Sequence, residues 1–498
     1  MAWEGGLSMS GKTRGEVFFS KAKYIILIFM ISSIPTSVLA DTKDDFEPWT
    51  VFQQGIAQQI LFSNINTPDS AAGTILASPS TYPFYRYFWI RDGALIINYL
   101  LDLYENTSSA ETKNKVEKVI FSYIDLSRKQ QLTINPAGGP SDTGLGEVKF
   151  NEDGSIYTFG WPRPQNDGPA LRAGVLIRFA YILLKSGREE YVRTKLYDGK
   201  YPNTETVIKA DLEYTAHHWR DPSYDLWEEV KGDHFYTRMA QRKALMDGAK
   251  FADRIGDDPK TSKFYSEQVS QLKIELSKHW DSGRGYLVAT LNQIEGHQDK
   301  KDNLDISIIL ALLHSPQEDG FMSFTDDMIL ATVSKLYLKF SDAYEINKNY
   351  RLDSAGKEMG PAQGRYFDDR FNGYNNNTRG NPWILATAGM AEFAYRARNE
   401  WQKVGHIKVT ELNLPYLKIM MPELGAVVGE TILSRDVRFR KAMLELKDSG
   451  DKFLRRIKFH SRPDGSLSEQ WDRETGFMTS AENLTWSCSS VMTATQVR

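Results

Sequence analysis

The sequence predicts an all-α protein, built as a helical toroid or a bundle. Apolar residues recur at three- and four-residue steps through about a dozen segments. In residues 170–184, for example, Leu171, Val175, Leu176 and Phe179 follow this spacing. Alternation with a period of two, which is typical of strands, is sparse. The helical segments follow one another in pairs, with conspicuous motifs in the connections, which favours layers of packed helices.

Each helix is predicted from its own stretch of this periodicity, and no short sequence repeat is visible. In chain order the predicted helices span residues 46–63, 93–105, 110–130, 169–186, 204–219, 234–255, 261–279, 304–314, 323–340, 382–400, 432–458 and 481–495. The long connections, rich in Gly, Pro and Asn, are 132–168, 280–303, 341–381 and 460–480. Because long loops inside a compact protein are usually functional, we expect functional residues in these connections.

Composition and charge are those of an ordinary globular protein. Apolar residues make up 41% of the 498 residues and charged residues 25%. The net charge of −3 implies no strong attraction to nucleic acid or to an anionic membrane. The single cysteine, Cys488, excludes an intramolecular disulfide. No metal or nucleotide motif is found, and the adjacent His217 and His218 face different sides of a helix, so we expect neither a metal nor a cofactor.

The N-terminal segment has the pattern of a signal peptide. Residues 24–40 are mostly apolar, follow a basic stretch that includes Lys23, and end with the small residue Ala40. The apolar run is short for a membrane span, and Pro35 interrupts it. We therefore expect removal of residues 1–40, secretion, and no stable membrane association afterwards, with the vacuole and the cell wall as alternative locations. The basic region is long, so an uncleaved signal anchor remains the other interpretation.

Three sequons for N-glycosylation begin at Asn106, Asn376 and Asn483. The first two lie in polar, loop-like stretches and are candidates for glycosylation. The third lies in an apolar segment and is expected to be buried.

Two acidic clusters in aromatic surroundings point to chemistry. Residues 224–229 read Tyr-Asp-Leu-Trp-Glu-Glu, and residues 466–472 read Ser-Leu-Ser-Glu-Gln-Trp-Asp. Two carboxylates for acid and base catalysis, with aromatic faces to hold sugar rings, are the components of a glycoside hydrolase. Taken alone, each cluster also fits a helix capping box, with Glu228 or Glu469 as its third helical residue.

Further motifs accompany these clusters in a fixed order. They are YRYFWIRDG (85–93), GLGEVKF (144–150), GWPRPQNDGPALRA (160–173), GRYFDD (364–369), GNPW (380–383) and LTWS (484–487). With YDLWEE and SEQ, this series resembles the glucoamylases of glycoside hydrolase family 15, especially the fungal and yeast members. The resemblance covers roughly residues 50–496.

The resemblance implies a fold and an activity. The fold is an (α/α)6 barrel, a six-hairpin toroid, whose long inner-helix loops form the pocket. The activity is hydrolysis of α-1,4 bonds, and more slowly α-1,6 bonds, from the non-reducing ends of starch, glycogen and maltooligosaccharides. The anomeric centre is inverted, so β-D-glucose is released.

The resemblance also implies roles for particular residues. Glu228 is the general acid and Glu469 the general base. The implied substrate-binding residues and supporting polar contacts are Tyr85, Trp89, Arg91, Asp92, Trp161, Arg163, Glu229, Arg365, Asp369, Trp383, Gln470, Ser480 and Trp486. A glycosidic oxygen leaves poorly until it is protonated, and Trp227 and Trp161 are expected to supply the apolar surroundings that keep Glu228 protonated. Inverting enzymes place the two carboxyls about 6.5–9.5 Å apart, which leaves room for the attacking water.

The chain also departs from its relatives. The loop between Asp369 and Asn381 looks enlarged by Asn and Gly. No Pro-rich or Ser/Thr-rich linker is visible, so we expect one catalytic domain over residues 41–498, without a starch-binding domain, in a monomer. Two other functions stay open: a family 15 enzyme for another α-glucoside, such as trehalose, isomaltose or dextran, and an inactive glucan-binding relative.

Overall fold

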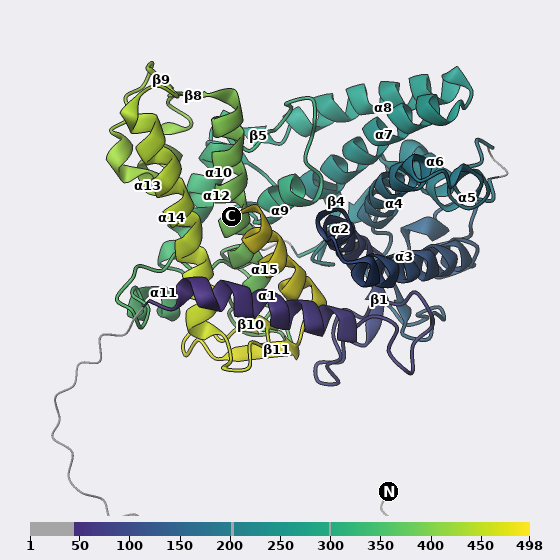
Figure 1. Cartoon of the computed structure of the whole chain (residues 1–498), viewed down its shortest axis with the longest axis horizontal. Coiled ribbons are helices and arrows are strands. Elements are labelled where there is room, and N and C mark those ends of the chain that lie inside the picture. Colours follow the sequence, from purple (N-terminus) through teal and green to yellow (C-terminus); the bar gives the residue numbers. More distant parts are fainter. Residues whose placement is uncertain (1–43, 201–203, 298–299) are drawn as a thin grey trace, which may run out of the picture. The chain divides into compact units, whose positions relative to one another are not determined.

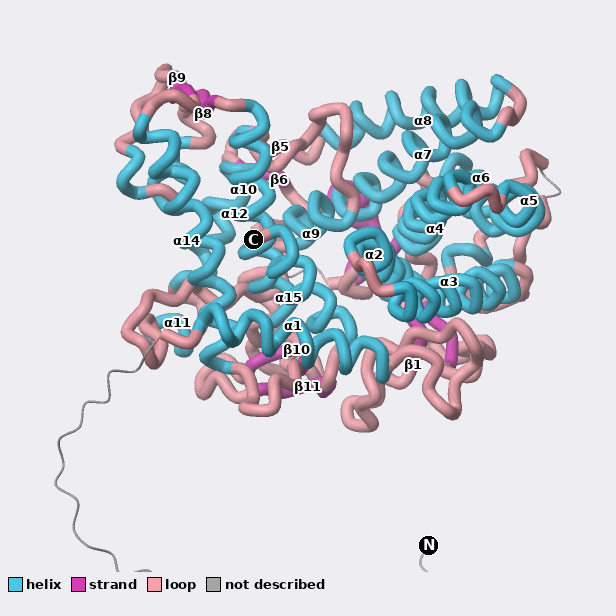
Figure 2. Tube along the Cα trace, in the orientation of Figure 1, coloured by secondary structure: helices cyan, strands magenta, loops and turns pink. Residues whose placement is uncertain are grey.

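The computed structural model describes residues 44–200, 204–297 and 300–498. Helices dominate the described part (Figure 1), and strands occur there only as short pieces within the connections (Figure 2). All twelve predicted helices are present, each within five residues of the expected bounds. The proposed signal segment, residues 1–40, lies outside the described residues.

Six helices form a closed inner ring. Neighbours around the ring contact one another in the order α2, α4, α7, α9, α12, α15 and back to α2. Their bounds are α2 Ile90–Asn106, α4 Asp167–Lys185, α7 Phe235–Ile255, α9 Ser307–His314, α12 Ile384–Val404 and α15 Thr485–Val497. Helices that are far apart in sequence thus close one barrel.

A second set of helices covers this ring from outside. Their bounds are α1 Phe46–Ser63, α3 Ala110–Gln131, α6 Val207–His218, α8 Pro259–Ser277, α10 Asp327–Ser341 and α14 Val437–His460. Inner and outer helices alternate along the chain, and each outer helix contacts an inner one, as α8 contacts α7 and α1 contacts α15 (Figure 1). The described residues therefore form an (α/α)6 barrel, as predicted. The short helices α5 Glu189–Tyr191, α11 Glu345–Asn349 and α13 Leu414–Met420 were not predicted.

The helical periodicity of the sequence corresponds to burial. On α4, Leu171, Leu176, Phe179 and Leu183 are each at most 5% exposed. These positions recur on one side of the helix, and burying each such side chain stabilises the fold by about 1.5–3 kcal/mol. Helix α7 ends at Ile255 and is followed by Gly256, whose φ of +78° is the left-handed conformation that glycine adopts at helix ends.

Short antiparallel strand pairs brace the connections, which the sequence predicted only as loops. Strand β1 (Tyr87–Trp89) pairs with β2 (Lys149–Asn151), and β10 (Ser468–Trp471) pairs with β11 (Met478–Glu482). A three-stranded sheet has the order β3-β4-β7. Its strands are β3 Ser223–Tyr224, β4 Val230–His234 and β7 Thr290–Gly296. The two remaining pairs join β5 (Trp280–Asp281) to β6 (Tyr286–Leu287) and β8 (His406–Lys408) to β9 (Thr431–Leu433).

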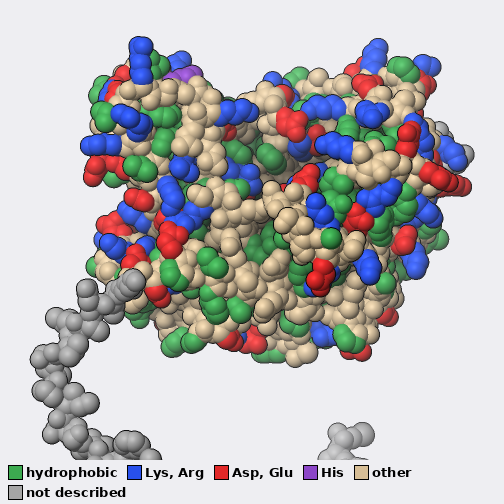
Figure 3. All heavy atoms as spheres, viewed as in Figure 1, with side chains coloured by type: hydrophobic (Ala, Val, Ile, Leu, Met, Phe, Trp, Pro, Cys, Tyr) green, Lys and Arg blue, Asp and Glu red, His purple; other side chains and the backbone are tan. Residues whose placement is uncertain are grey.

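Charges of both signs are interspersed over the face shown in Figure 3, in keeping with the small net charge. Within the described ranges, no helix is both long and apolar enough to cross a membrane.

Candidate active site

The pocket lies where the inner helices begin. A pocket of about 420 Å³ is lined by residues that precede or start α2, α4, α7, α12 and α15. The remaining inner helix, α9, follows Asp305, which accepts a hydrogen bond from the pocket residue Trp227. Helix N-termini carry a partial positive charge, so this end of the barrel favours carboxylates and electron-rich oxygens.

Most of the predicted site residues meet in this pocket. Those that line it are Tyr85, Trp89, Arg91, Asp92, Trp161, Glu228, Glu229, Arg365, Trp383, Glu469 and Trp486. Four predicted residues do not line it: Arg163, Asp369, Gln470 and Ser480. Asp369, Gln470 and Ser480 hold residues that do, as described below.

Glu228 lies in a strained turn between β3 and β4. Its φ of +66° is in the left-handed region, which non-glycine residues rarely adopt. The carboxylate of Asp225 stabilises the turn by accepting hydrogen bonds from the backbone N–H of Glu229 (2.8 Å) and of Val230 (3.0 Å). The indole of Trp89 donates to Glu228 Oε1 at 2.6 Å, and Oε2 accepts no hydrogen bond from the described residues. The helix-cap interpretation of this cluster is therefore wrong.

Glu469 lies on strand β10 and is 2% exposed, so it does not cap a helix either. Its Oε2 accepts hydrogen bonds from Ser480 Oγ at 2.5 Å and from Gln470 Nε2 at 3.0 Å. Burial raises the pKa of Glu469 to about 7, while the hydrogen bonds from Ser480, Tyr85 and Gln470 and the charge of Arg365 oppose this rise.

Arg91 and Asp92 form a buried pair at the first turn of α2. Arg91 Nε lies 3.3 Å from Asp92 Oδ1, and Arg91 Nη1 donates to Gln165 Oε1 at 2.8 Å and to Asp167 Oδ2 at 3.3 Å. Burial raises the pKa of Asp92 to about 6, and Arg91 counteracts this effect. Gln165 and Asp167, at the start of α4, position this pocket cation, whereas Trp161 of the same sequence motif lines the pocket.

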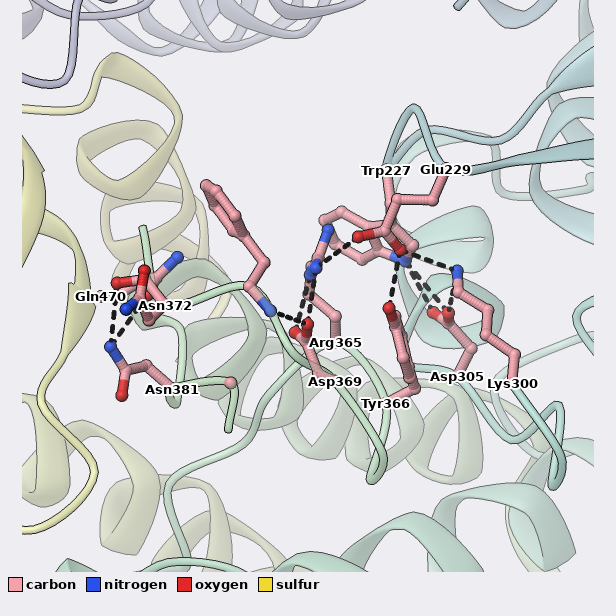
Figure 4. A network of polar contacts seen from close by, with 12 residues as sticks. Trp227, Glu229, Lys300, Asp305, Arg365, Tyr366, Asp369, Asn372, Asn381 and Gln470 are labelled. Carbon is pink, nitrogen blue, oxygen red and sulfur yellow. Dashed lines mark hydrogen bonds and ion pairs between the residues drawn. The ribbon is translucent and has the colours of Figure 1, made fainter. Parts of the chain in front are cut away.

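A buried ion network fixes Arg365 and Glu229 (Figure 4). Arg365 Nη2 donates to Glu229 Oε1 at 2.7 Å and to Asp369 Oδ1 at 2.6 Å, and its Nε donates to Asp369 Oδ2 at 2.8 Å. Tyr366 Oη donates to Glu229 Oε2 at 2.7 Å. Two parallel bonds to one carboxylate hold a guanidinium in one orientation, so Asp369 acts on the pocket through Arg365.

Lys300, which was not predicted as a site residue, completes this network. Its Nζ lies 3.3 Å from Glu229 and 3.8 Å from Asp305 (Figure 4). It also lies 2.9 Å from Asp225, and all four side chains are less than 10% exposed. Burial disfavours the charge of Lys300, but these carboxylates raise its pKa above its usual value. Losing one partner of a buried ion pair typically costs about 3–5 kcal/mol of stability. Because Lys300 pairs with Asp225, which holds the turn at Glu228, Lys300 supports that turn as well.

Lys149, in the GLGEVKF motif (144–150), is a second cation that was not predicted as a site residue. Its Nζ lies among the rings of Tyr87, Trp89, Tyr157 and Trp161, at 3.1 Å from the Trp161 ring centroid and 4.5 Å from that of Trp89. Burial lowers the pKa of Lys149 to about 7. Cation–π contacts of this kind fix the two tryptophans that form one pocket wall.

Arg163, a predicted substrate contact, does not line the pocket. Its Nε donates to both oxygens of Glu147 (2.7 and 2.8 Å), and its remaining hydrogen bonds reach the backbone carbonyls of Tyr157, Phe159 and Trp161. All of its hydrogen bonds within the described residues are thus directed at the loop. Arg163 shapes the loop that presents Trp161.

Aromatic side chains make up much of the pocket wall. Trp227 contacts Trp383 and Trp486, with ring centroids 5.6 and 6.4 Å apart. The buried indole Nε1 atoms of Trp161, Trp383 and Trp486 have no hydrogen-bond partner within the described residues. The rings of these residues present apolar faces to the pocket, which suits the apolar C–H faces of sugars.

A helical barrel with paired carboxylates and aromatic walls at one end defines a glycoside hydrolase. The model of glycosyl hydrolases family 15 matches residues 50–496, and the chain belongs to this family. It is 37% identical to the glucoamylase of Blastobotrys adeninivorans over 93% of this chain and 74% of that protein. It is 34% identical to a probable glucoamylase of Schizosaccharomyces pombe, over 90% of this chain and 91% of that protein.

Solved structures agree with this assignment. The glucoamylase from Saccharomycopsis fibuligera superposes with a TM-score of 0.80 at 31% identity, over 91% of this chain and 95% of that one. The family 15 glucoamylase from Hypocrea jecorina gives a TM-score of 0.79 at 32% identity, over 91% and 72% of the two chains. The predicted family and barrel fold are confirmed.

Proposed function

We propose that this protein is an exo-acting, inverting glucan 1,4-α-glucosidase. It releases β-D-glucose from the non-reducing ends of starch, glycogen and maltooligosaccharides, cleaving α-1,4 bonds and, more slowly, α-1,6 bonds. The observation that carries this proposal is the pocket in which Glu228 and Glu469 meet, between aromatic walls and beside two buried arginines. Membership of family 15 and the named glucoamylases among the relatives support the substrate class.

Glu228 is proposed as the general acid and Glu469 as the general base. Taken alone, the raised pKa of Glu469, about 7, would suit a proton donor. The hydrogen bonds directed at its carboxylate favour the ionised form instead, and Ser480 holds it in a fixed orientation. Glu228 keeps one carboxyl oxygen free, where a proton can face the glycosidic oxygen. We therefore assign the roles by hydrogen-bond geometry.

The polar side chains of the pocket are proposed to hold the glucose hydroxyls. Arg91 and Asp92 present a charged pair that gives strong, directional hydrogen bonds to the terminal sugar. Arg365, held in place by Asp369 and Glu229, donates hydrogen bonds to hydroxyl groups of the two rings that flank the cleaved bond.

The exo-acting mode is supported by a contrast in exposure among the residues that line the pocket. Arg91 is 5% and Trp486 6% exposed, whereas Tyr374, which also lines the pocket, is 43% exposed. One end is thus enclosed and the other is open. A pocket of this form admits a chain end and excludes the middle of a chain.

The first product from maltose is expected to be β-D-glucose, because water that is activated by Glu469 attacks opposite the leaving oxygen. Proton NMR within the first minutes, before mutarotation, tests this expectation. Initial α-glucose would indicate a retaining mechanism and contradict the role of Glu469. Maltose, isomaltose and trehalose assayed side by side establish the specificity, and binding without glucose release would indicate an inactive relative.

The same proposal includes secretion as a monomer after cleavage behind Ala40, which the composition of residues 24–40 supports. N-terminal sequencing of the secreted protein is expected to begin at Asp41. Recovery of the intact chain in a membrane pellet would instead indicate an uncleaved anchor.

A further inference from the structure

Two exposed tyrosines are stacked at the open end of the pocket. The rings of Tyr82 and Tyr374 have centroids 5.3 Å apart and planes inclined by 29°. Tyr82 is 80% exposed and Tyr374 is 43% exposed. Tyr82 precedes the pocket residue Pro83, and Tyr374 lines the pocket itself between Gly373 and Asn376. The stacked pair therefore continues the pocket wall outward.

The loop that carries Tyr374 is held by Ser480, the residue that donates a hydrogen bond to Glu469. Tyr374 Oη accepts a hydrogen bond from the backbone N–H of Ser480 at 3.2 Å. Ser480 Oγ, whose single proton is directed at Glu469, also lies 3.2 Å from the carbonyl oxygen of Gly373. A Cβ atom at Gly373 would lie 2.3 Å from Ser480 Cβ, and its φ is +93°, so only glycine permits this close approach. Tyr374 is thus held in place relative to the reacting centre.

A bound glucan must leave the pocket at this end. Its non-reducing end enters first under the proposed function, so the remaining glucose units extend past the exposed wall. Sugar rings present apolar C–H faces, and a tyrosine offers a large amphipathic surface with few rotatable bonds to immobilise. One face of the Tyr82 ring is covered by Tyr374, and its high exposure leaves the other surface accessible.

We infer that Tyr82 and Tyr374 form a binding platform for a glucose unit of an α-1,4-glucan, beyond the two rings at the cleaved bond. This inference rests on the proposed function. The platform gives the site a preference for chains longer than maltose. Tyr82 supplies the exposed surface, and Tyr374 supports it and positions it.

Tyr82→Ala tests the platform through its dependence on chain length. We expect kcat/KM for maltoheptaose to fall about two- to tenfold, mainly through KM, as an aromatic contact of about 0.5–1.5 kcal/mol implies. Turnover of maltose should stay within about twofold of the wild type, because maltose does not reach the platform. Tyr82→Phe should restore maltoheptaose turnover. Phe52→Ala, an exposed aromatic on the outer helix α1, is the matched control.

Other outcomes would overturn the inference. Unchanged maltoheptaose kinetics, or an equal loss on both substrates, would show that Tyr82 binds no distant glucose unit. A change in sedimentation without a kinetic effect would assign the stacked pair to a contact between copies of the chain. If the wild type released no glucose from either substrate, the proposed function would fail, and the platform with it.

Discussion

Glu228→Gln is expected to lower maltose turnover by about 10²–10⁴-fold, because an amide cannot donate the proton that the leaving oxygen needs. The variant should fold, since the glutamine carbonyl can still accept the hydrogen bond from Trp89. α-D-Glucosyl fluoride distinguishes loss of the proton donor from a general loss of activity, because fluoride departs without protonation. Glu228→Gln should therefore retain most of its turnover of α-D-glucosyl fluoride. Glu295→Gln, a change of an exposed carboxylate on β7, is the control.

Glu469→Gln should give the complementary result. It is expected to lose turnover of both substrates, because neither reaction proceeds without activated water. Added azide, a small anionic nucleophile, should restore turnover of the fluoride and yield β-glucosyl azide. If Glu469→Gln retained fluoride turnover and Glu228→Gln lost it, the two roles would have to be exchanged. That result would agree with the raised pKa of Glu469 and contradict the hydrogen-bond geometry.

Glu469→Gln is also expected to stabilise the protein increasingly as pH rises. Burial moves the pKa of Glu469 from 4.5 to about 7, so the folded state binds more protons than the unfolded state between these values. The free energy of unfolding of the wild type therefore falls as pH rises through this window, by roughly 3 kcal/mol from this group. Glutamine removes this dependence. The free energies of unfolding of Glu469→Gln and the wild type should therefore differ most near pH 8 and least near pH 4.5.

Urea denaturation at a series of pH values measures this difference. Asp92, with its pKa of about 6, adds a slope of the same sign to both proteins, so its effect cancels in the comparison. Glu474→Gln changes an exposed carboxylate and should give a curve parallel to that of the wild type. Parallel curves for Glu469→Gln as well would show that the carboxylate is not disfavoured in the folded state.

The barrel could be predicted because its signal is local. The spacing of Leu171, Leu176, Phe179 and Leu183 predicts a helix and its buried side from one stretch of chain, and the structure confirms both. Strand pairs such as β1–β2 were missed because each strand is only three residues long and its partner lies about sixty residues away.

The sequence motifs predict which residues belong to the site. They do not distinguish residues that line the pocket from residues that hold the lining residues in place. Arg163 and Arg91 both looked like pocket cations in sequence. In the structure Arg91 lines the pocket, whereas Arg163 is directed at Glu147 and at the carbonyls of its own loop. Hydrogen-bond partners decide between these roles, and they cannot be read from residue type.

The sequence by itself determined the helical order, the family and the two carboxylates on which catalysis is proposed to depend. Only the tertiary structure decided how those carboxylates are held. Lys300 reaches Asp225 and Glu229 across more than seventy residues, and Ser480 reaches Glu469 from the opposite strand of its pair. Periodicity is a property of neighbouring residues, whereas desolvation and ion pairing depend on which distant segments the closed ring of helices brings together.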